Sequence, residues 1–575
     1  MHDPDPPLEW VYPVENESFK SEIIQEFNLH PTIAQTLIAS NYTSLEDINH
    51  FLFAKLPSLY SPELMKEMPS AVEYILKAID CKKQITILGD DDVDGITGTA
   101  LLVEFLTDIG ADVSYVIPSK TWLNSDYKQT VLKPLNEKNT SLVITVDCGI
   151  TAFEELKELA DHNIDVIITD HHIPKNTTPP AVAIINPKSI DNDYPNSDLT
   201  GVGVAFKLAH AIINKLVSSG KISSSEVNLK KFLDLVALGT VADMGTLKDE
   251  NRILVRYGLK QFSTTKRIGL IKLLEKCQVN PLKVSTGDIS SKLAPVLNSL
   301  GRIDVPEKGV ALLLTRDTAY ANKLVSKFIA TNERRRIMEK EHTKDVQNFL
   351  DTHPNVLLHK AIAIASNKWH PGIIPILAAK LSKQFNRPAL VIASKNGVGK
   401  GSIRSIQKFS VIDTLKKFEH LMLDYGGHDF AAGLLILEEN IAMLKKLFID
   451  EVDSFLKLSD IQSKIKLSSV LSFEDISFEL IESLEFLKPF GIGNNQPIFY
   501  ADVELAQPPR IIGKTHLKLV FTQKNITLEG IGFGLGQKKL VLEKKKNRSC
   551  RIAFFPQKCT YKNKDNITLI IKDFK

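Results

Sequence analysis

The sequence contains few cysteines and no long apolar run. Its five cysteines are scattered along the 575 residues, at Cys81, Cys148, Cys277, Cys550 and Cys559. An odd, dispersed set without Cys-x-x-Cys spacing argues against a disulfide framework and against a thiolate zinc site. No 18 apolar residues run together, and no basic segment followed by an apolar one opens the chain, so we expect neither a membrane span nor a secretory signal. These absences predict a cytoplasmic protein.

Internal repeats and low-complexity tracts are also missing. With 43% hydrophobic and 24% charged residues, the chain has the composition of a globular protein, and its length predicts three or four domains. The net charge of +3 hides an uneven distribution, because residues 508–575 hold 16 Lys and Arg against 4 Asp and Glu, which leaves −9 on the remaining chain. A basic C-terminal module favours nucleic acid as a partner, although a solvated lysine-rich surface has the same composition.

The order of apolar and polar residues predicts an α/β protein. Strand-like runs alternate with helical segments from about residue 84 to 185 and again from about 358 to 450, which is typical of βαβ units. After about residue 465 the chain is strand-rich with Gly, Asn and Pro breaks, as in a small β-barrel or sandwich. The predicted parts are a helical segment (1–80), a first α/β domain (81–245), a helical region with a charged connector helix (246–350), a second α/β domain (351–455) and a C-terminal β-rich module (460–575).

Three short acidic and histidine clusters lie in the first α/β domain. They are Asp90–Gly95 (Asp-Asp-Asp-Val-Asp-Gly), Asp147–Gly149 (Asp-Cys-Gly) and Asp170–His172 (Asp-His-His), and each directly follows a short apolar run. Such runs are typical of buried parallel strands, whose carboxyl ends line the usual ligand crevice of an α/β sheet. Carboxylates with one or two imidazoles suit Mg²⁺ or Mn²⁺ better than a metal that prefers thiolates. The clusters therefore predict a metal-dependent phosphoesterase.

Each cluster also has a simpler interpretation. The first could be a solvated acidic loop, although its four carboxylates repel one another unless cations compensate, and such a loop seldom follows a buried strand. Asp147 could be a helix N-cap. The adjacent imidazoles of His171 and His172 have little packing rationale after a buried strand, so the third cluster points most directly to a metal.

Longer motifs extend along most of the chain. They are Leu199–Ala209, Leu233–Asp243, Leu293–Arg302, Trp369–Gly372, Gly401–Ile406, Gly426–Gly433, Pro489–Pro497 and His516–Leu519. With the three clusters, this ordered series resembles the DHH phosphoesterase superfamily and, within it, the RecJ family of single-stranded-DNA-specific exonucleases. The resemblance implies a DHH catalytic domain with a parallel sheet, a DHHA1 α/β domain and a C-terminal module that resembles an oligonucleotide-binding (OB) barrel.

The resemblance also implies residue roles. The metal ligands would be Asp92, Asp94, Asp147, His171 and Asp243. Two catalytic auxiliaries would orient ligands or the attacking water, namely Asp90 and His172. The residues that bind phosphate would be Arg302, Ser402, Arg404, Gly427 and His428. Asp234 and Asp243 are about half a helical turn out of phase, so both should not face one metal, and the family pattern selects Asp243.

The chain departs from the family pattern after Pro118. Where the family has an arginine and a Glu-Gly-Tyr-Gly segment, this chain reads Ser119–Lys128 without glycine. Lys120 keeps a positive charge at the arginine position but not its bidentate geometry. No proposed metal ligand is lost, so the departure predicts reduced activity or altered end preference rather than loss of chemistry.

The resemblance implies a 5′→3′ exonuclease that degrades single-stranded DNA with two Mn²⁺ or Mg²⁺ ions in DNA repair and recombination. A helicase and a single-strand-binding protein would be its protein partners. Two alternatives stay open: a DHH phosphodiesterase for short oligonucleotides or cyclic dinucleotides, and a non-catalytic DNA-binding scaffold. The basic C-terminal module argues against small substrates, and the complete set of predicted ligands argues against a scaffold.

Overall fold

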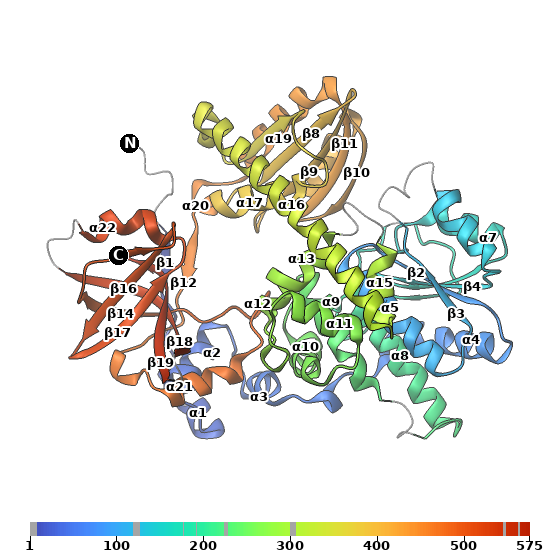
Figure 1. The fold of residues 1–575 in the computed structure, drawn as a ribbon, viewed down its shortest axis with the longest axis horizontal. Helices are drawn as coiled ribbons and strands as arrows, with labels where there is room; N and C mark the ends of the chain where they lie inside the picture. The colour runs from blue at the N-terminus through green and yellow to red at the C-terminus, as the bar shows by residue number, and fades with distance from the viewer. Residues whose placement is uncertain are drawn as a thin grey trace. The chain divides into compact units, whose positions relative to one another are not determined.

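The computed structural model describes residues 8–118, 127–175, 177–190, 192–223, 228–299, 306–543, 548–561 and 564–575. The chain divides into two compact units: one holds Met1–Val11 and Ala330–Lys466, and the other holds Tyr12–Ile329 and Leu467–Lys575 (Figure 1). Within the described ranges, no helix is both long and apolar enough to cross a membrane.

A parallel sheet of five strands forms the centre of the first α/β domain, in the order β3-β2-β4-β5-β6. The strands are β2 (Ile85–Gly89), β3 (Val113–Val116), β4 (Leu142–Val146), β5 (Asp165–Thr169) and β6 (Ala183–Ile185). Every residue of β2 and β4 is buried, which is why their sequences are continuous apolar runs. The strands predicted before the three polar clusters are confirmed.

Helices cover both faces of this sheet, so the predicted βαβ pattern is also confirmed. One face packs against α4 (Met68–Asp80), α5 (Val93–Asp108) and α8 (Gly201–Ser218). The other face packs against α6 (Lys133–Glu137) and α7 (Phe153–Asp161). Because both faces are covered, side chains from this sheet reach solvent only at its edges and strand ends.

A helical region follows the first α/β domain. Its helices are α9 (Leu233–Ala242), α10 (Asp249–Gln261), α11 (Ile268–Lys276), α12 (Thr286–Asp288), α13 (Ala294–Leu297), α15 (Glu307–Leu314) and α16 (Thr318–Thr352). The charged connector helix expected near residues 328–350 is the C-terminal part of the 35-residue helix α16. Residues 300–305, which include Arg302, lie outside the described residues, as does the altered segment 119–126.

The second α/β domain contains a five-stranded sheet in the order β10-β11-β9-β8-β7, in which only β7 and β8 pair in parallel. The strands are β7 (Ile362–Ser366), β8 (Ala389–Lys395), β9 (Val398–Arg404), β10 (Met422–His428) and β11 (Ala431–Leu437). Helix α17 (Ile374–Phe385) packs on one face, and α18 (Val411–Lys417) and α19 (Ile441–Phe455) pack on the other. In the same unit, β1 (Glu9–Val11) pairs in parallel with β12 (Lys464–Lys466).

The C-terminal module contains a seven-stranded sheet in the order β13-β14-β18-β19-β17-β16-β15. The strands are β13 (Ser469–Val470), β14 (Phe499–Leu505), β15 (Arg510–Ile512), β16 (His516–Gln523), β17 (Ile526–Gly532), β18 (Ser549–Tyr561) and β19 (Lys564–Phe574). An additional pairing of β14 with β16 joins five of these strands in a closed circuit. The core of the module includes apolar residues of α1 (Glu17–Phe27), α2 (Pro31–Ala39) and α3 (Leu45–Phe53).

A buried ion pair fixes α8 against α10. The side chains of Lys207 and Glu250 are both fully buried, and Lys207 Nζ lies 2.9 Å from Glu250 Oε1. Glu250 also accepts hydrogen bonds from the Tyr194 hydroxyl (2.6 Å) and from the backbone N–H of Tyr60 (2.9 Å). Lys207 donates to the carbonyl of Tyr60 as well, so the pair is fully hydrogen-bonded. A protein loses stability when one partner of such a pair is removed, because the remaining charge stays buried.

Replacement of Lys207 by Met should therefore lower the free energy of unfolding by about 3–5 kcal/mol, since it leaves the Glu250 carboxylate uncompensated. Lys215→Met on the same helix is the matched control, because Lys215 pairs with Glu73 at the surface. The control should change stability by less than about 1 kcal/mol. Guanidinium unfolding followed by circular dichroism measures the free energy of unfolding of both variants. Equal losses in Lys207→Met and Lys215→Met would show that the buried pair stabilises the protein no more than the surface pair does.

Candidate metal centre

The first residue after each of three central strands is an aspartate. The strand register aligns Gly89, Val146 and Thr169, so Asp90, Asp147 and Asp170 follow in the next row. The backbone N–H of Asp90 donates to Val146 O (3.2 Å), and that of Asp147 donates to Thr169 O (3.0 Å). The three predicted clusters therefore meet at the carboxyl edge of the sheet, as the sequence indicated.

The first cluster continues into α5. Asp92 is the N-cap of this helix, and its Oδ1 accepts hydrogen bonds from Asp94 N (2.9 Å) and Gly95 N (3.2 Å). Asp94 is buried in the first turn, and its carboxylate accepts from the backbone N–H groups of Gly201 (2.6 Å) and Val202 (3.0 Å) at the start of α8. Two helix N-termini thus hold these two carboxylates in place.

Glycines allow the helices to approach the carboxylates closely. A Cβ atom on Gly201 would lie 2.6 Å from Asp147 Oδ1, and one on Gly239 of α9 would lie 2.8 Å from Asp94 Oδ1. Asp147 has a left-handed backbone conformation, with φ of 63°, and lies outside any helix. The N-cap of the next helix, α7, is Ala152, so the alternative interpretation of Asp147 as a helix cap is wrong.

His171 lies between carboxylates from different elements. Its Nε2 is 3.0 Å from Asp147 Oδ1 and 3.7 Å from Asp243 Oδ2, and Asp243 is the C-cap of α9. Within the described residues, three groups have ligand atoms within 4.8 Å of one another. These groups are Asp147, His171 and His172; Asp94, His171 and Asp243; and Asp90, Asp92 and Asp147.

Asp170 orients the second histidine. Its Oδ1 accepts from His172 Nδ1 (2.7 Å) and from the backbone N–H groups of His171 (2.7 Å) and His172 (3.0 Å), and its Oδ2 accepts from Ile150 N (3.0 Å). Burial alone would raise the pKa of Asp170, but the hydrogen bond and charge of His172, together with the backbone N–H donors of Ile150 and His172, outweigh it and lower that pKa. Burial would lower the pKa of His172, yet Asp170 raises it to about 9, so this imidazole is cationic at neutral pH.

The carboxylates of the site repel one another in a buried setting. Burial, followed by the charges of neighbouring aspartates, raises the pKa of Asp94 and of Asp147 well above the ordinary value. Burial and the charge of Asp92 raise the pKa of Asp243 to about 7. Asp147 Oδ1 is buried and accepts no hydrogen bond from the described residues. Crowded carboxylate oxygens, with the His171 imidazole beside Asp147 Oδ1 at 3.0 Å, fit a hard divalent cation such as Mn²⁺ or Mg²⁺.

The structure brings together all seven residues predicted for this centre, namely Asp90, Asp92, Asp94, Asp147, His171, His172 and Asp243. Asp234 lies elsewhere, as predicted: its carboxylate accepts from Thr265 Oγ1 (2.6 Å) and Arg267 Nε (3.3 Å). Sequence reasoning missed two supporting residues. It gave no role to Asp170, and it gave none to Asn298, whose Oδ1 accepts from Val93 N (3.0 Å) at the start of α5. Asp170 belongs to the cluster Asp170–His172, and Asn298 belongs to the motif Leu293–Arg302.

Three of the four residues predicted to bind phosphate in the second α/β domain, Ser402, Arg404 and His428, share one sheet face. Ala431 pairs with Arg404 on β9 and with His428 on β10, so the three form one row. Ser402 is two residues from Arg404 on the same strand, and Arg404 Nη1 donates to Ser402 Oγ (3.2 Å). Gly427 has φ of 144°, and a Cβ there would lie 2.3 Å from Ala431 O, so the backbone requires glycine.

Family models match three ranges of the chain. A model of the N-terminal domain of the DHH family matches residues 84–240, a DHHA1 domain model matches residues 356–457, and a RecJ OB domain model matches residues 468–573.

Curated relatives match most of the chain. It is 32% identical over 542 residues to the single-stranded-DNA-specific exonuclease RecJ of Bacillus subtilis, covering 92% of this chain and 66% of the relative. It is 31% identical over 522 residues to the exonuclease of the same name from Haemophilus influenzae, covering 88% of this chain and 90% of that relative.

A solved structure matches the whole fold. The crystal structure of Thermus thermophilus RecJ in complex with Mn²⁺ is similar with a TM-score of 0.82 and 27% identity, over 100% of this chain and 80% of that one. The Mg²⁺ complex of the same protein matches with a TM-score of 0.76 and 25% identity, over 99% of this chain and 78% of that one.

The repulsion in the site predicts a pH dependence of the metal-free protein. A carboxyl whose pKa is raised on folding penalises the folded state once the pH exceeds its unfolded value, so the midpoint of thermal unfolding in EDTA should fall as pH rises from about 4 to 8. Asp147→Asn should flatten this fall, whereas Asp161→Asn at the surface of α7 should not. A wild-type midpoint that rises over this range would contradict the electrostatic account.

Proposed function

The chain belongs to the RecJ family of single-stranded-DNA-specific exonucleases, and from this membership we propose that it hydrolyses single-stranded DNA from the 5′ end in the presence of Mn²⁺ or Mg²⁺. The observation that carries the proposal is the convergence of five aspartates and two histidines at the carboxyl edge of the sheet. We further propose that it serves DNA repair and recombination in the cytoplasm.

The proposed metal ligands are the five that the family resemblance implies: Asp92, Asp94, Asp147, His171 and Asp243. All five belong to the groups whose ligand atoms lie close together, as do Asp90 and His172. Two bound divalent ions would supply charge neutralisation at a scissile phosphate and a more acidic water molecule. Asp147 belongs to two of the ligand groups, so it is the carboxylate best placed to be shared between two ions. Asp90 belongs to one of the same groups and is proposed to orient the attacking water or a ligand.

His172 has a different proposed task. Asp170 fixes its ring through Nδ1 and keeps it cationic at neutral pH. A fixed positive charge beside the ligands can hold a phosphate oxygen and stabilise the negative charge that develops during an in-line displacement. Without Asp170, the imidazole would lose the hydrogen bond that orients its ring, and its pKa would fall.

The second α/β domain is proposed to bind the terminal phosphate. Arg404 offers a planar fork for phosphate oxygens, and Ser402 and His428 on the same sheet face add a hydroxyl and an imidazole. Between them lie only small residues, Ala431 and Gly433, which leave room for a phosphate above the sheet. Arg302 is proposed to contact substrate on the resemblance of its motif alone.

The basic C-terminal module is proposed to hold the single strand outside the catalytic centre. Its surplus of positive charge and its match to the RecJ OB domain support this role. A helicase that opens duplex ends and a single-strand-binding protein are proposed partners, because this substrate arises only when strands separate.

One variant tests the metal chemistry. Asp147→Ala should reduce hydrolysis of single-stranded DNA by thousands-fold or more, since loss of a shared ligand removes several kcal/mol of transition-state stabilisation. The fold should remain intact by circular dichroism, and Asp161→Ala is the surface control. Hydrolysis is followed on a strand labelled at one end in Mn²⁺ buffer. Activity within about tenfold of wild type would refute the two-metal assignment.

A second variant tests polarity and the terminal phosphate. A 5′-phosphorylated strand should be degraded faster than a 5′-hydroxyl strand, and Arg404→Ala should erase about 1.5–3 kcal/mol of that preference. Arg404→Lys should keep part of it, because it retains the charge but not the fork. Lys446→Ala on α19, which covers the opposite face of the sheet, should behave as wild type. Shortening from the 3′ end would overturn the polarity.

A further inference from the structure

A loop of the C-terminal module contacts the segment that follows Asp243. This loop, Pro489–Asn494, belongs to a motif that stands out in the sequence but has no role in the chemistry above. The backbone N–H of Leu247 donates to Ile492 O at 2.7 Å. The two glycines of the loop make the contact possible, because a Cβ on Gly491 would lie 2.6 Å from Leu247 Cδ1 and one on Gly493 would lie 2.6 Å from Thr246 Cγ2.

The segment between Asp243 and Leu247 is tightly packed, so a displacement of Leu247 would also displace Asp243. Met244 has φ of 60°, and the N–H of Gly245 donates to Thr240 O (2.8 Å), so α9 ends in a tight turn directly after Asp243. A Cβ on Gly245 would lie 2.6 Å from Thr200 Cγ2, which leaves the turn no room to shift toward α8. Leu247 is buried in a cluster that also contains Val93, the residue between Asp92 and Asp94.

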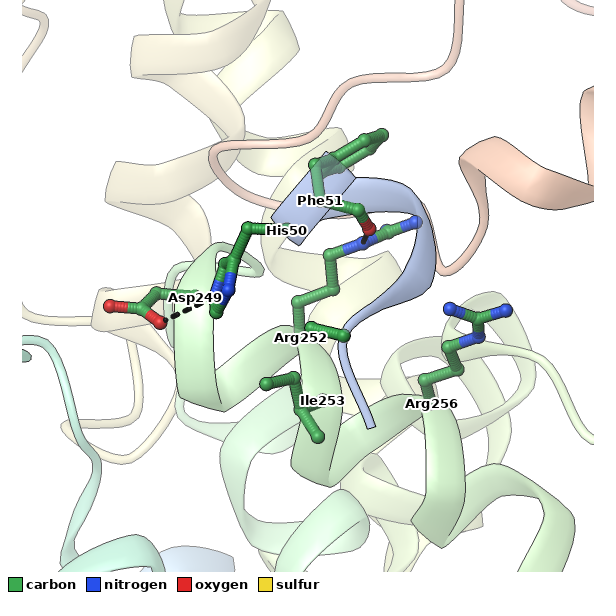
Figure 2. A pocket seen from close by; sticks show the side chains of 7 residues that line it. His50, Phe51, Asp249, Arg252, Ile253 and Arg256 are labelled. Carbon is green, nitrogen blue, oxygen red and sulfur yellow. Dashed lines mark hydrogen bonds and ion pairs between the residues drawn. The ribbon is translucent and has the colours of Figure 1, made fainter. Parts of the chain in front are cut away.

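The other side of the loop is anchored to the helical region. Arg252 of α10 is buried, and it donates to Phe486 O (2.9 Å), Leu487 O (3.1 Å) and Phe51 O (3.0 Å). Figure 2 shows this guanidinium beside the Phe51 backbone, while the nearby Asp249 carboxylate pairs with His50 instead. The charged side chain therefore binds backbone carbonyls, and its Cζ lies 3.7 Å from the Phe51 ring centroid.

Three further hydrogen bonds complete the anchoring. Thr286 Oγ1 of α12 donates to Phe490 O at 2.6 Å. Asn494 Nδ2 donates to Leu487 O and to Pro489 O, each at 2.8 Å, so the loop is also braced internally. Arg252 of α10 thus holds the residues that lead into the loop, and Thr286 of α12 holds the loop itself, while the two loop glycines contact Thr246 and Leu247.

We propose that the loop Pro489–Asn494 is a positioning element that sets the location of Asp243 in the metal centre. The inference rests on the proposed assignment of Asp243 as a metal ligand. It gives the C-terminal module a second role, in which the module tunes metal binding and turnover as well as holding DNA. A loop that merely attached the module would affect thermal stability and the KM for long strands, but not the affinity for Mn²⁺.

The test uses the full-length protein and Mn²⁺ as the probe. Gly493 has φ of 76°, so Gly493→Ala adds both backbone strain and a contact with Thr246. Its dissociation constant for Mn²⁺, measured by calorimetry without DNA, should rise about tenfold, as for other residues that orient a ligand. The kcat on a short oligonucleotide should fall, while its KM stays within about twofold.

The matched control is Gly534→Ala. Gly534 has φ of 75° in the same module, but a Cβ there would meet no atom within 4 Å, so the strain is equal and the contact is absent. Thr286→Val removes only the bond to Phe490 and should also weaken Mn²⁺ binding, by a smaller factor than Gly493→Ala. This second variant keeps the proposal testable if Gly493→Ala fails to fold.

The outcomes separate the two proposals. Asp243→Asn should itself weaken Mn²⁺ binding, and if it does not, the ligand assignment fails and the positioning role falls with it. If Asp243→Asn weakens binding but Gly493→Ala and Thr286→Val bind Mn²⁺ as wild type does, the positioning role alone is overturned. An equal loss of affinity in Gly534→Ala would likewise overturn it, because that loss would come from strain without contact.

Discussion

The crowding of carboxylates at the end of the parallel sheet is the constraint on which the catalytic domain depends. Asp94 and Asp147 are buried beside other aspartates, and their pKa values are raised well above the ordinary one by burial and by those neighbours. The surrounding structure makes this arrangement tolerable: helix N-termini donate to Asp92 and Asp94, and glycines let α8 and α9 approach. The fold therefore prepares a position where positive charge is required.

Part of this could be predicted from the sequence, because its signals are local. The apolar runs before Asp90, Asp147 and Asp170 predicted buried strands, and parallel strands necessarily end at a common edge. The DHH, DHHA1 and OB parts were recognised from motifs, and family models match all three. The supporting residues were harder to find, because Asn298 acts on Val93 across 205 positions and no local pattern reports such a contact.

Helix caps were also only partly predictable from the sequence. An aspartate before a helix can be a cap, a ligand or both, and the sequence left a helix cap open as an alternative for Asp147. In the structure Asp92 caps α5, while Asp147 caps no helix. Backbone conformation distinguishes the two aspartates, because Asp147 has a left-handed conformation that the sequence pattern did not predict. The charged connector helix was easier to predict from the sequence, because a charge pattern on an exposed helix does not depend on a tertiary partner.

The shared core of the C-terminal module has a consequence for synthesis. Helices α1–α3 come before the metal centre in the chain, yet their apolar side chains pack with strands that lie between Ser469 and Phe574. On the ribosome these helices must wait until the intervening domains have been made before their partners exist, with residues such as Ile33 and Leu52 uncovered in the meantime. Contacts of this sequence separation are slow to form, so the core of this module is completed only after the domains between its two parts.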